Sequence, residues 1–382
     1  MKILAIQNFM RQRDTGGAEL LCHDIFTGLA RMGHSVDVLT AGTAKYEERY
    51  RVEPLMSSNP RVEQRRQMRT LLAKLRWMGV ARRNYRIVQQ AVRKHRPDVV
   101  YVHNLEWTTL SPLAAALDMG VRTAVHCHNH YYGHYWKHHR HSPSLVQRLS
   151  HTEPALERAR MIAVSQAIAR PLAGHGFPPD RLQVVYNGLP DEILDGAVPA
   201  QRERKLLFVG AVSRHKGTHV ALEALALLRD QGLVLPLEII GTGRSARYQG
   251  QLVTFIRREK LGKQVTYAGA LLRRDVWARM RTAEIVLVPS LCLEAFGLAA
   301  AEAMACGAIP VVSDRGALPE VVGDNGFVAE PTAQAFAGAI RSAIGLTQQE
   351  KQERREKARE HVRGSFRLSV MVAQVEKVLM AV

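Results

Sequence analysis

The stretch that decides the fold is Pro289–Pro310, P-S-L-C-L-E-A-F-G-L-A-A-A-E-A-M-A-C-G-A-I-P, which follows the apolar run Ile285–Val288. This run, Ile-Val-Leu-Val, predicts a buried parallel strand, because it is too short for a helix. From about Phe296 the residues favour a helix, which Gly307 closes. A strand, a loop and a helix in this order aim helical N–H groups at the carboxyl end of the strand. An anionic phosphate binds at such a place.

Two carboxylates flank this expected phosphate site. Glu294 lies in the loop, and Glu302 lies eight positions later, in the second turn of the helix. A carboxylate is a strong acceptor for the paired hydroxyls of a sugar or a ribose, so the pair suggests a nucleotide sugar. The alternative is an ordinary amphipathic helix with Glu294 in a capping role and Glu302 in solvent. The residues alone leave both interpretations open.

The same stretch resembles the E-x7-E signature of the family 4 retaining glycosyltransferases, which have the GT-B fold. The frame is P-S-(x)n-E-x-F-G-L-x-x-x-E-A-M-A-x-G-x-x-P-V. The resemblance implies an α/β protein with two doubly wound Rossmann-like domains that face each other across a cleft. It also implies that Glu294 lies by the transferred sugar and that Glu302 binds the ribose. The amides between them, at Phe296, Gly297 and Leu298, would hold the diphosphate.

Length and composition fit a globular protein of two domains. The chain has 382 residues, of which 46% are hydrophobic and 23% charged. We expect no transmembrane span, because Glu294 and Glu302 interrupt the longest apolar region. The start of the chain predicts a first strand, not a signal peptide. The four cysteines form no CxxC pair and suit a reduced cytosol, so we expect a cytoplasmic protein.

The net charge of +18, from 53 basic and 35 acidic residues, indicates an anionic partner. Nucleotide diphosphate and anionic lipid both fit, whereas no recognition motif supports nucleic acid. The expected helical segment Asn59–Arg96 carries twelve Lys and Arg residues against one acid, Glu63. It is either a solvated basic helix whose apolar stripe faces its own core or a surface, Arg61–Arg96, that touches an anionic membrane. In the second case the protein would be peripheral on the inner face of the membrane.

The first domain opens with a βαβ pattern. Lys2–Gln7 predicts a strand, and the Gly16-Gly17 loop leads into an amphipathic helix that ends near Met32. From the residues alone this loop is a tight turn. The resemblance places the matching G-G-x-E loop beside the donor phosphate, so Gly16 and Gly17 become candidate donor-binding residues.

A histidine-rich stretch follows the strand expected at Arg122–His126. Its spacing fits no compact zinc pattern and no cysteine pairs with it, so we expect no metal ligand there. In the family a strand ends in H-D or H-N, which matches His128-Asn129. The resemblance therefore places His128 next to the reacting sugar, with His126 as the nearest competitor.

The second domain begins with a strand that ends at Gly210 and a loop that carries Arg214 and Lys216. A glycine, cations and a helix start together make a phosphate site. The loop resembles the family's G-R-x-x-x-x-K-G motif, in which Lys216 occupies the position of the diphosphate-binding lysine. Ala211 replaces the usual arginine, and Arg214 is the candidate to supply the missing charge.

A second glycine turn, Gly241-Thr242-Gly243, follows the strand Leu237–Ile240. Alone it is a weak signal, but the resemblance places this turn, with Gly241 and Gly243, at the nucleotide pocket.

The domain boundary is expected in Leu189–Lys205, whose prolines, Gly196 and charges indicate an exposed linker. This divides the chain into an acceptor-binding domain, residues 1–190, and a nucleotide-sugar-binding domain, residues 205–364. The segment Gln348–Arg363 mixes acids and bases at helical spacing and predicts a solvated helix. By resemblance, residues 365–382 form a helix that packs back on the first domain.

The predicted activity is the transfer of a sugar, with retention, from a nucleotide-diphosphate sugar to a glycan or lipid-linked acceptor. Such an enzyme would serve cell-surface polysaccharide or glycolipid synthesis. Cations such as Lys216 would neutralise the leaving group, so we expect no obligatory metal or other cofactor. Three alternatives remain: a nucleotide-sugar epimerase or phosphorylase, a natural-product glycosyltransferase, and a non-catalytic subunit that binds sugar nucleotides, which the substitution at Ala211 favours.

Overall fold

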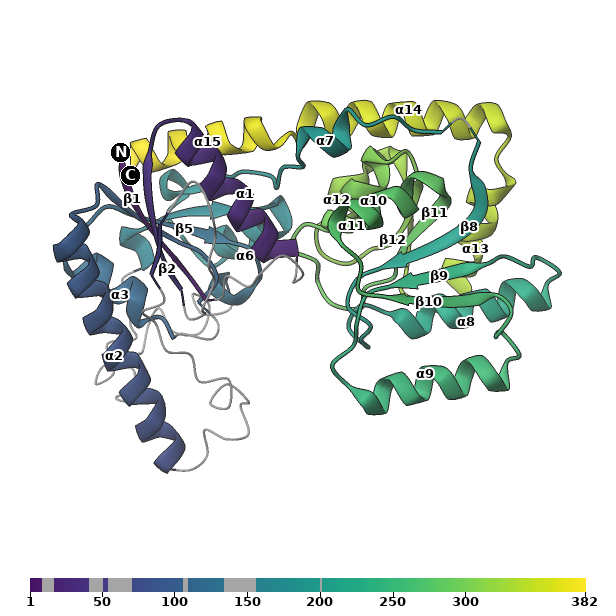
Figure 1. The fold of residues 1–382 in the computed structure, drawn as a ribbon, viewed down its shortest axis with the longest axis horizontal. Coiled ribbons are helices and arrows are strands. Elements are labelled where there is room, and N and C mark those ends of the chain that lie inside the picture. The colour runs from purple at the N-terminus through teal and green to yellow at the C-terminus, as the bar shows by residue number, and fades with distance from the viewer. Residues whose placement is uncertain (9–16, 41–50, 54–70, 106–108, 134–155, 200) are drawn as a thin grey trace. The chain divides into compact units, whose positions relative to one another are not determined.

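The protein, seen in a computed structural model, consists of two compact α/β units (Figure 1). One unit comprises Met1–Tyr186 and Ser369–Val382, and the other Asn187–Leu368. The structure describes residues 1–8, 17–40, 51–53, 71–105, 109–133, 156–199 and 201–382.

The first unit is built on a parallel sheet of seven strands in the order β3-β2-β1-β4-β5-β6-β7. Its central strand β4, Val-Val-Tyr-Val, is a short apolar run with every residue buried, as expected for a sheet covered on both faces. The strands are β1 (Lys2–Gln7), β2 (Ser35–Thr40), β3 (Arg51–Glu53), β4 (Val99–Val102), β5 (Thr123–Cys127), β6 (Arg160–Ala163) and β7 (Leu182–Val184).

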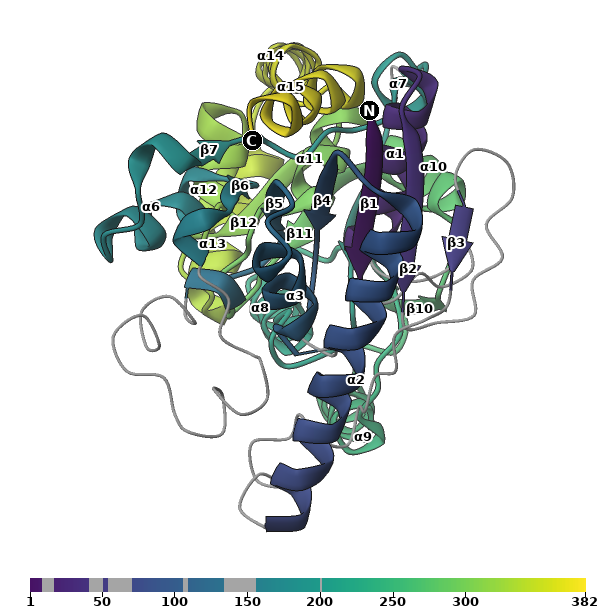
Figure 2. The ribbon, with the colours of Figure 1, turned by 90° about the vertical axis from the view of Figure 1, so that its left-hand side faces the viewer.

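Helices cover both faces of this sheet. α2 and α3 lie side by side on one face, toward the viewer in Figure 2, and α1 lies on the other. The described helices of this unit are α1 (Gly17–Arg31), α2 (Leu71–His95), α3 (Ser111–Asp118), η2 (Leu156–Arg158), α6 (Gln166–Gly174), η3 (Pro179–Arg181) and α15 (Leu368–Ala381).

The C-terminal helix α15 packs against α1. A Cβ at Gly28 would lie 2.8 Å from Val372 Cγ2, so glycine allows the close approach of the two helices. His34 Nε2 also lies 2.6 Å from Glu376 Oε1. These contacts make α15 part of the first unit.

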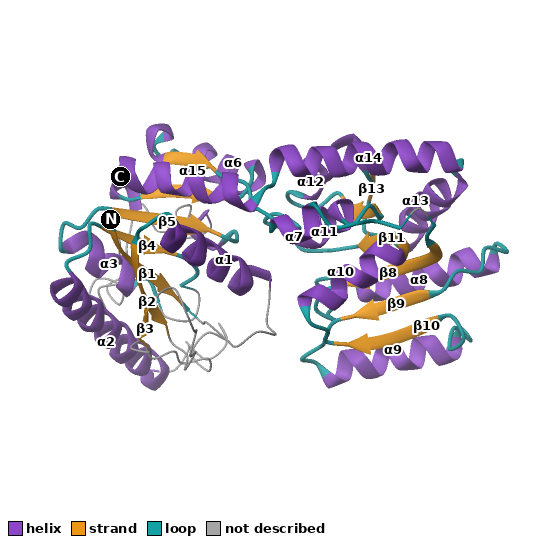
Figure 3. Ribbon diagram, turned by 45° about the horizontal axis from the view of Figure 1, so that its top comes forward, coloured by secondary structure: helices purple, strands orange, loops and turns teal. Residues whose placement is uncertain are grey.

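The second unit has a parallel sheet of six strands in the order β10-β9-β8-β11-β12-β13. The helices α8 and α9 lie on one face, and α10, α11 and α12 on the other (Figures 1 and 3). The strands are β8 (Glu203–Val209), β9 (Leu237–Ile240), β10 (Val265–Gly269), β11 (Ala283–Val288), β12 (Ile309–Ser313) and β13 (Phe327–Ala329). The helices are α7 (Asp191–Leu194), α8 (Thr218–Asp230), α9 (Ala246–Arg258), α10 (Arg273–Thr282), α11 (Leu298–Ala305), α12 (Leu318–Val322), η4 (Gly323–Asn325), α13 (Ala333–Gly345) and α14 (Gln348–Ser365).

Both sheets have a topological switch point, where the strand order reverses. It falls between β1 and β4 in the first unit and between β8 and β11 in the second. Ligands of such sheets bind beyond the carboxyl ends of the strands at this point. The prediction of two doubly wound α/β domains is confirmed.

The expected exposed linker is partly wrong. Within it, α7 buries Ile193 and Leu194. Two arginines of α14 donate to carbonyl groups of the same segment: Arg363 Nε donates to Leu194 O at 3.1 Å, and Arg359 donates to Gly196 O at 3.0 Å. The prolines and charges of this segment concealed an apolar pair that packs into the second unit.

The helix α14 is not simply solvated, as the mixture of charges had indicated. It buries Ala358 and Val362, together with Lys351 and Arg355. Lys351 Nζ forms a buried ion pair with Glu284 Oε1 at 2.8 Å, which explains how a lysine occupies this face. No helix of the described residues is both long enough and apolar enough to span a membrane.

Candidate functional site

Two loops meet at the switch point of the second unit. One follows β8 and the other follows β11, and the backbone N–H of Leu291 donates to His215 O at 2.8 Å. Gly217 has a φ of 71°, and a Cβ at this position would lie 1.8 Å from Pro289 O. Only glycine permits this approach. The two loops are therefore held together by their backbones.

This junction brings Lys216 and Glu294 into contact. Lys216 Nζ lies 2.6 Å from Glu294 Oε1, and the Ser290 hydroxyl donates to the same oxygen. Ser313 Oγ in turn donates to Ser290 O at 2.7 Å. The lysine side chain is 36% exposed and the glutamate 12%. The carboxylate is thus fixed in place, while the ammonium group, which has three donors, remains accessible to an anion.

The glycines predicted at the nucleotide pocket bring the loops after β8 and β9 together. Val212 N donates to Thr242 O at 2.9 Å. A Cβ at Gly241, whose φ is 137°, would lie 1.8 Å from Gly210 O, and one at Gly243 would lie 2.5 Å from Val212 O. Glycine is required at these positions because the backbones of the two loops approach each other closely. Their contact with a nucleotide stays a prediction.

The helix α11 begins two residues later than the sequence predicts. Gly297 has a φ of 97°, outside the helical region, and precedes the first helical residue, Leu298. No side chain caps this helix start. Phe296 is buried, and its ring packs edge-to-face against Phe366 with the ring centroids 5.1 Å apart, so its side chain anchors the loop and only its backbone is suited to a ligand.

Glu302 is held by two residues that sequence reasoning missed. Trp277 Nε1 donates to Glu302 Oε1 at 3.1 Å, and Arg273 Nε lies 3.5 Å from the same oxygen. The Arg273 guanidinium lies over the Trp277 ring at 4.9 Å. The alternative of a solvated Glu302 is wrong, since its side chain is only 14% exposed. The signal for this contact was weak: an arginine and a tryptophan four residues apart on α10.

Arg214 and Ala211, both exposed, lie on the loop after β8. Within the part of the chain that the structure describes, no ion pair engages the Arg214 guanidinium. Its role as the substitute for the family's arginine stays a prediction.

In the first unit, His128 lies just beyond the carboxyl end of β5. His103, just beyond β4, places Nδ1 2.8 Å from His128 Nε2. His126 is fully buried in β5, where its Nδ1 lies 2.6 Å from Tyr101 Oη, so His128 is the better placed of the two for a ligand. Gly17 begins α1, whereas Gly16 and His134, His138, His139 and His141 lie outside the described residues.

Burial sets the charge of these histidines. It lowers the pKa of His128 to about 4. The pKa values of His103 and His126 also fall well below the ordinary value, because of burial and then the neighbouring His128. All three imidazoles are neutral at pH 7, so they act there as hydrogen-bond partners or ligands and not as cations.

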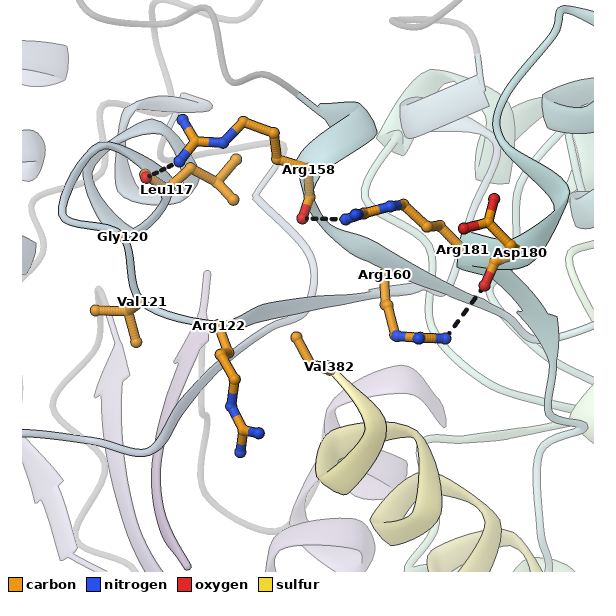
Figure 4. A pocket seen from close by; sticks show the side chains of 9 residues that line it. All are labelled: Leu117, Gly120, Val121, Arg122, Arg158, Arg160, Asp180, Arg181 and Val382. Carbon is orange, nitrogen blue, oxygen red and sulfur yellow. Dashed lines mark hydrogen bonds between the residues drawn. The ribbon is translucent and has the colours of Figure 1, made fainter.

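A separate hollow of about 240 Å³ lies at the opposite edge of the first sheet (Figure 4). Apart from Val382, which follows α15, its residues precede β5, β6 or β7 or begin β6, so the hollow lies at the amino ends of these strands. Its arginines are fixed by carbonyl groups, as where Arg158 donates to Leu117 O at 3.0 Å and Arg181 to Arg158 O at 2.9 Å. It is lined by Leu117, Gly120, Val121, Arg122, Arg158, Arg160, Asp180, Arg181 and Val382. The hollow is therefore not part of the candidate site, which lies beyond the carboxyl ends of the strands.

Two family models match consecutive parts of the chain. The model described as Glycosyltransferase Family 4 matches residues 15–192, and the model described as Glycosyl transferases group 1 matches residues 191–362. The chain belongs to the family 4 glycosyltransferases.

Within this family, the chain is 28% identical over 250 residues to the putative colanic acid biosynthesis glycosyltransferase WcaL of Salmonella typhimurium. The match covers 61% of each chain, so it spans less than two thirds of that relative.

Solved structures of glycosyltransferases are similar over the whole chain. Anabaena HepE, in complex with UDP and glucose, has a TM-score of 0.74 with 21% identity and full coverage of both chains. WaaG, a glycosyltransferase involved in lipopolysaccharide biosynthesis, has a TM-score of 0.72 with 16% identity and 99% coverage of each chain. The GT-B fold of this family 4 member is thereby confirmed.

Proposed function

We propose that the protein is a retaining glycosyltransferase that moves a sugar from a nucleotide-diphosphate sugar to a glycan or lipid-linked acceptor. The observation that carries the proposal is the Lys216–Glu294 pair at the switch point of the second unit, beside the uncapped starts of α8 and α11. The names of similar proteins support a role in polysaccharide synthesis and a nucleotide-sugar donor. WcaL is named for colanic acid biosynthesis, and HepE was solved with UDP and glucose.

The leaving diphosphate gains negative charge as the sugar departs. Lys216 Nζ is exposed enough to meet this charge, and the N–H groups at the start of α8 and α11 add donors. Preorganised cationic and N–H groups of this kind stabilise the transition state without a metal. We therefore propose that transfer needs no cation, with Arg214 as an auxiliary positive charge.

Glu294 is suited to position the sugar. Its Oε1 is engaged by Lys216 and Ser290, an arrangement that holds the carboxylate in one orientation. A fixed carboxylate accepts hydrogen bonds from sugar hydroxyls. In our proposal it does not attack the sugar; the acceptor displaces the diphosphate from the same face, and a phosphate oxygen takes the acceptor proton. His128, as a neutral imidazole, adds a hydrogen bond to the sugar.

Glu302 is suited to bind the ribose. Trp277 and Arg273 hold its carboxylate in one orientation, which reduces the entropy lost when ribose hydroxyls bind. In this proposal the two glutamates of the signature have separate tasks, one at the sugar and one at the nucleotide.

The proposed acceptor surface includes α2. This helix buries Ala81, Asn84 and Val88, and its described basic residues face solvent. Each basic residue near an anionic membrane contributes roughly 1 kcal/mol, so several suffice for reversible binding from the cytoplasmic side. Flotation with anionic and neutral vesicles tests this: binding to anionic vesicles only, lost in high salt, is expected. Equal flotation with both would favour a soluble acceptor. The exposed basic residues of this surface are Arg82, Arg83, Arg86, Arg93 and Lys94 on α2 and Arg96 just after it.

The deciding experiment incubates the full chain with labelled UDP-, GDP-, ADP- and dTDP-sugars and a membrane extract. Transfer to an acceptor, with the anomeric configuration retained by NMR and full activity in a chelator, is the expected result. Isomerised or phosphorolysed donor would instead support the epimerase or phosphorylase. Transfer to a small molecule alone would support natural-product glycosylation, and binding without turnover a non-catalytic subunit.

A further inference from the structure

Cys22, His103 and His128 converge from three different elements of the first unit. Cys22 lies on α1, and the two histidines follow the neighbouring strands β4 and β5. Cys22 Sγ lies 3.3 Å from His103 Nδ1 and 3.7 Å from His128 Nε2. The two nitrogens are 2.8 Å apart. One sulfur and two imidazole nitrogens thus face a common point.

These separations match the requirements of a tetrahedral zinc ion. Zn–S bonds of about 2.3 Å and Zn–N bonds of about 2.0–2.1 Å place the sulfur about 3.5 Å from each nitrogen and the nitrogens about 3.3 Å apart. The observed sulfur–nitrogen distances lie on either side of the first value. The imidazoles must separate by about 0.5 Å, which small ring rotations provide.

The electrostatics of the cluster act on metal binding in two opposite ways. The pKa values of His103 and His128 are lowered by burial, so both imidazoles are neutral and able to bind a metal at pH 7. Burial, followed by the charge of Glu19, raises the pKa of the Cys22 thiol. A zinc ion would therefore have to displace the thiol proton, and the negative charges of Glu19 and Asp24 favour a cation at this point.

The outer nitrogens of the cluster determine how strongly it binds. His103 Nε2 and His128 Nδ1 are buried and have no hydrogen-bond partner among the described residues. Metal-binding histidines usually donate this second N–H to a carboxylate or carbonyl, and loss of that partner costs about 10–100-fold in affinity. The expected site is reversible and is not a structural metal centre.

We propose that Cys22, His103 and His128 form a binding site for a thiophilic divalent cation, best fitted by Zn²⁺, and that this cation inhibits the enzyme. The inhibition rests on the proposed function: a metal on His128 Nε2 takes that nitrogen away from the donor sugar. Water would complete the coordination. This cation has no part in the transfer reaction, which we propose to be metal-independent.

Metal binding is tested on the metal-free full chain, without reference to activity. Co²⁺ is the probe, because a thiolate–cobalt bond gives a charge-transfer absorption band, and Zn²⁺ is measured by equilibrium dialysis. We expect one equivalent of each metal and the cobalt band. Cys22→Ser should abolish the band and weaken Zn²⁺ binding at least about tenfold. The matched control is Cys127→Ser, a buried cysteine one residue before His128 that is not in the cluster.

The outcomes separate the cluster from its alternatives. A cobalt band that survives in Cys22→Ser, or no stoichiometric metal in the wild-type chain, would overturn the site and leave a hydrogen-bonded imidazole pair. Circular dichroism checks that the variants are folded. If Cys22→Ser does not fold, His103→Gln takes its place and should also lower the affinity for Zn²⁺.

The inhibitory role has its own readout. Zn²⁺ should inhibit sugar transfer by the wild type and by Cys127→Ser, whereas Cys22→Ser should remain active and resist inhibition. If Zn²⁺ binds and transfer is unchanged, the inhibitory role is wrong. If the chain transfers no sugar at all, the proposed function fails and the metal measurements still decide the site.

Discussion

The two units present chemically opposite sites beyond the carboxyl ends of their strands. In the second unit the polar groups are charged and paired: Lys216 with Glu294, and Glu302 with Arg273. In the first unit the cluster around His128 is neutral, and its outer nitrogens lack partners among the described residues. Paired charges are fixed in advance and suit an anionic diphosphate. Neutral imidazoles suit hydroxyl groups, and their nitrogens are also open to soft cations.

The largest expected effect comes from the backbone that holds the charged pair together. Gly217→Ala forces a side chain into a position with a φ of 71° and a Cβ 1.8 Å from Pro289 O. The loops must separate, so we expect loss of donor binding and a several-degree fall in Tm. The matched control is Gly250→Ala in α9, which has nothing within 4 Å of the new Cβ and should raise stability slightly. Equal Tm shifts in the two variants would show that the loops are not locked.

Lys216→Ala tests the charged pair itself. Removal of a preorganised donor to the leaving group should lower kcat by about 10²–10³-fold. The side chain is partly exposed, so its contribution to stability should stay within about 1 kcal/mol. Lys263→Ala removes an exposed lysine of the same unit and serves as the control. Wild-type kcat in Lys216→Ala would place the diphosphate elsewhere.

Glu302→Gln should have a more modest effect and weaken the binding of the donor. The amide retains the shape but loses the charge-assisted bonds to ribose hydroxyls, which costs about 1–3 kcal/mol of binding. Calorimetry with the preferred nucleotide sugar measures this loss, with Glu353→Gln on the exposed side of α14 as the control. Unchanged affinity in Glu302→Gln would remove Glu302 from the ribose site.

The last prediction concerns acid and the stability of the first unit. The folded pKa of His128, about 4, lies below its ordinary value of 6.5, so in this window the unfolded chain binds more protons than the folded chain. The part of the free energy of unfolding that comes from the neutral imidazole should be fully present above about pH 6.5 and should be lost as the pH drops toward about 4. Denaturant unfolding across this range measures it, and a smaller slope is expected for His128→Gln. Identical slopes would mean that the histidine is not held neutral by the fold.

The sequence predicts the second-unit site well where chemistry is local. The apolar run of β11, the loop and the helix start are contiguous, so Glu294 and the start of α11 follow from the pattern. Trp277 and Arg273 escape prediction because α10 precedes β11, and only the order of the strands brings them to Glu302.

The first-unit cluster shows the limit more clearly. Cys22 is separated from His128 by 106 residues, so no spacing rule joins them. The histidine-rich stretch itself gave no zinc pattern, because two of the three ligand atoms lie outside it. Parallel strands that end at one edge of a sheet create such clusters, and a sequence motif does not record them.

We propose above all that the second unit binds the nucleotide diphosphate at the junction of the loops after β8 and β11. Hydrogen exchange with mass spectrometry tests it most directly, on the full chain with and without a saturating nucleotide sugar. We predict that the donor slows exchange in peptides that cover residues 213–219 and 294–301, and that Lys216→Ala reduces this protection. Bound donor with no protection in either peptide would contradict the account.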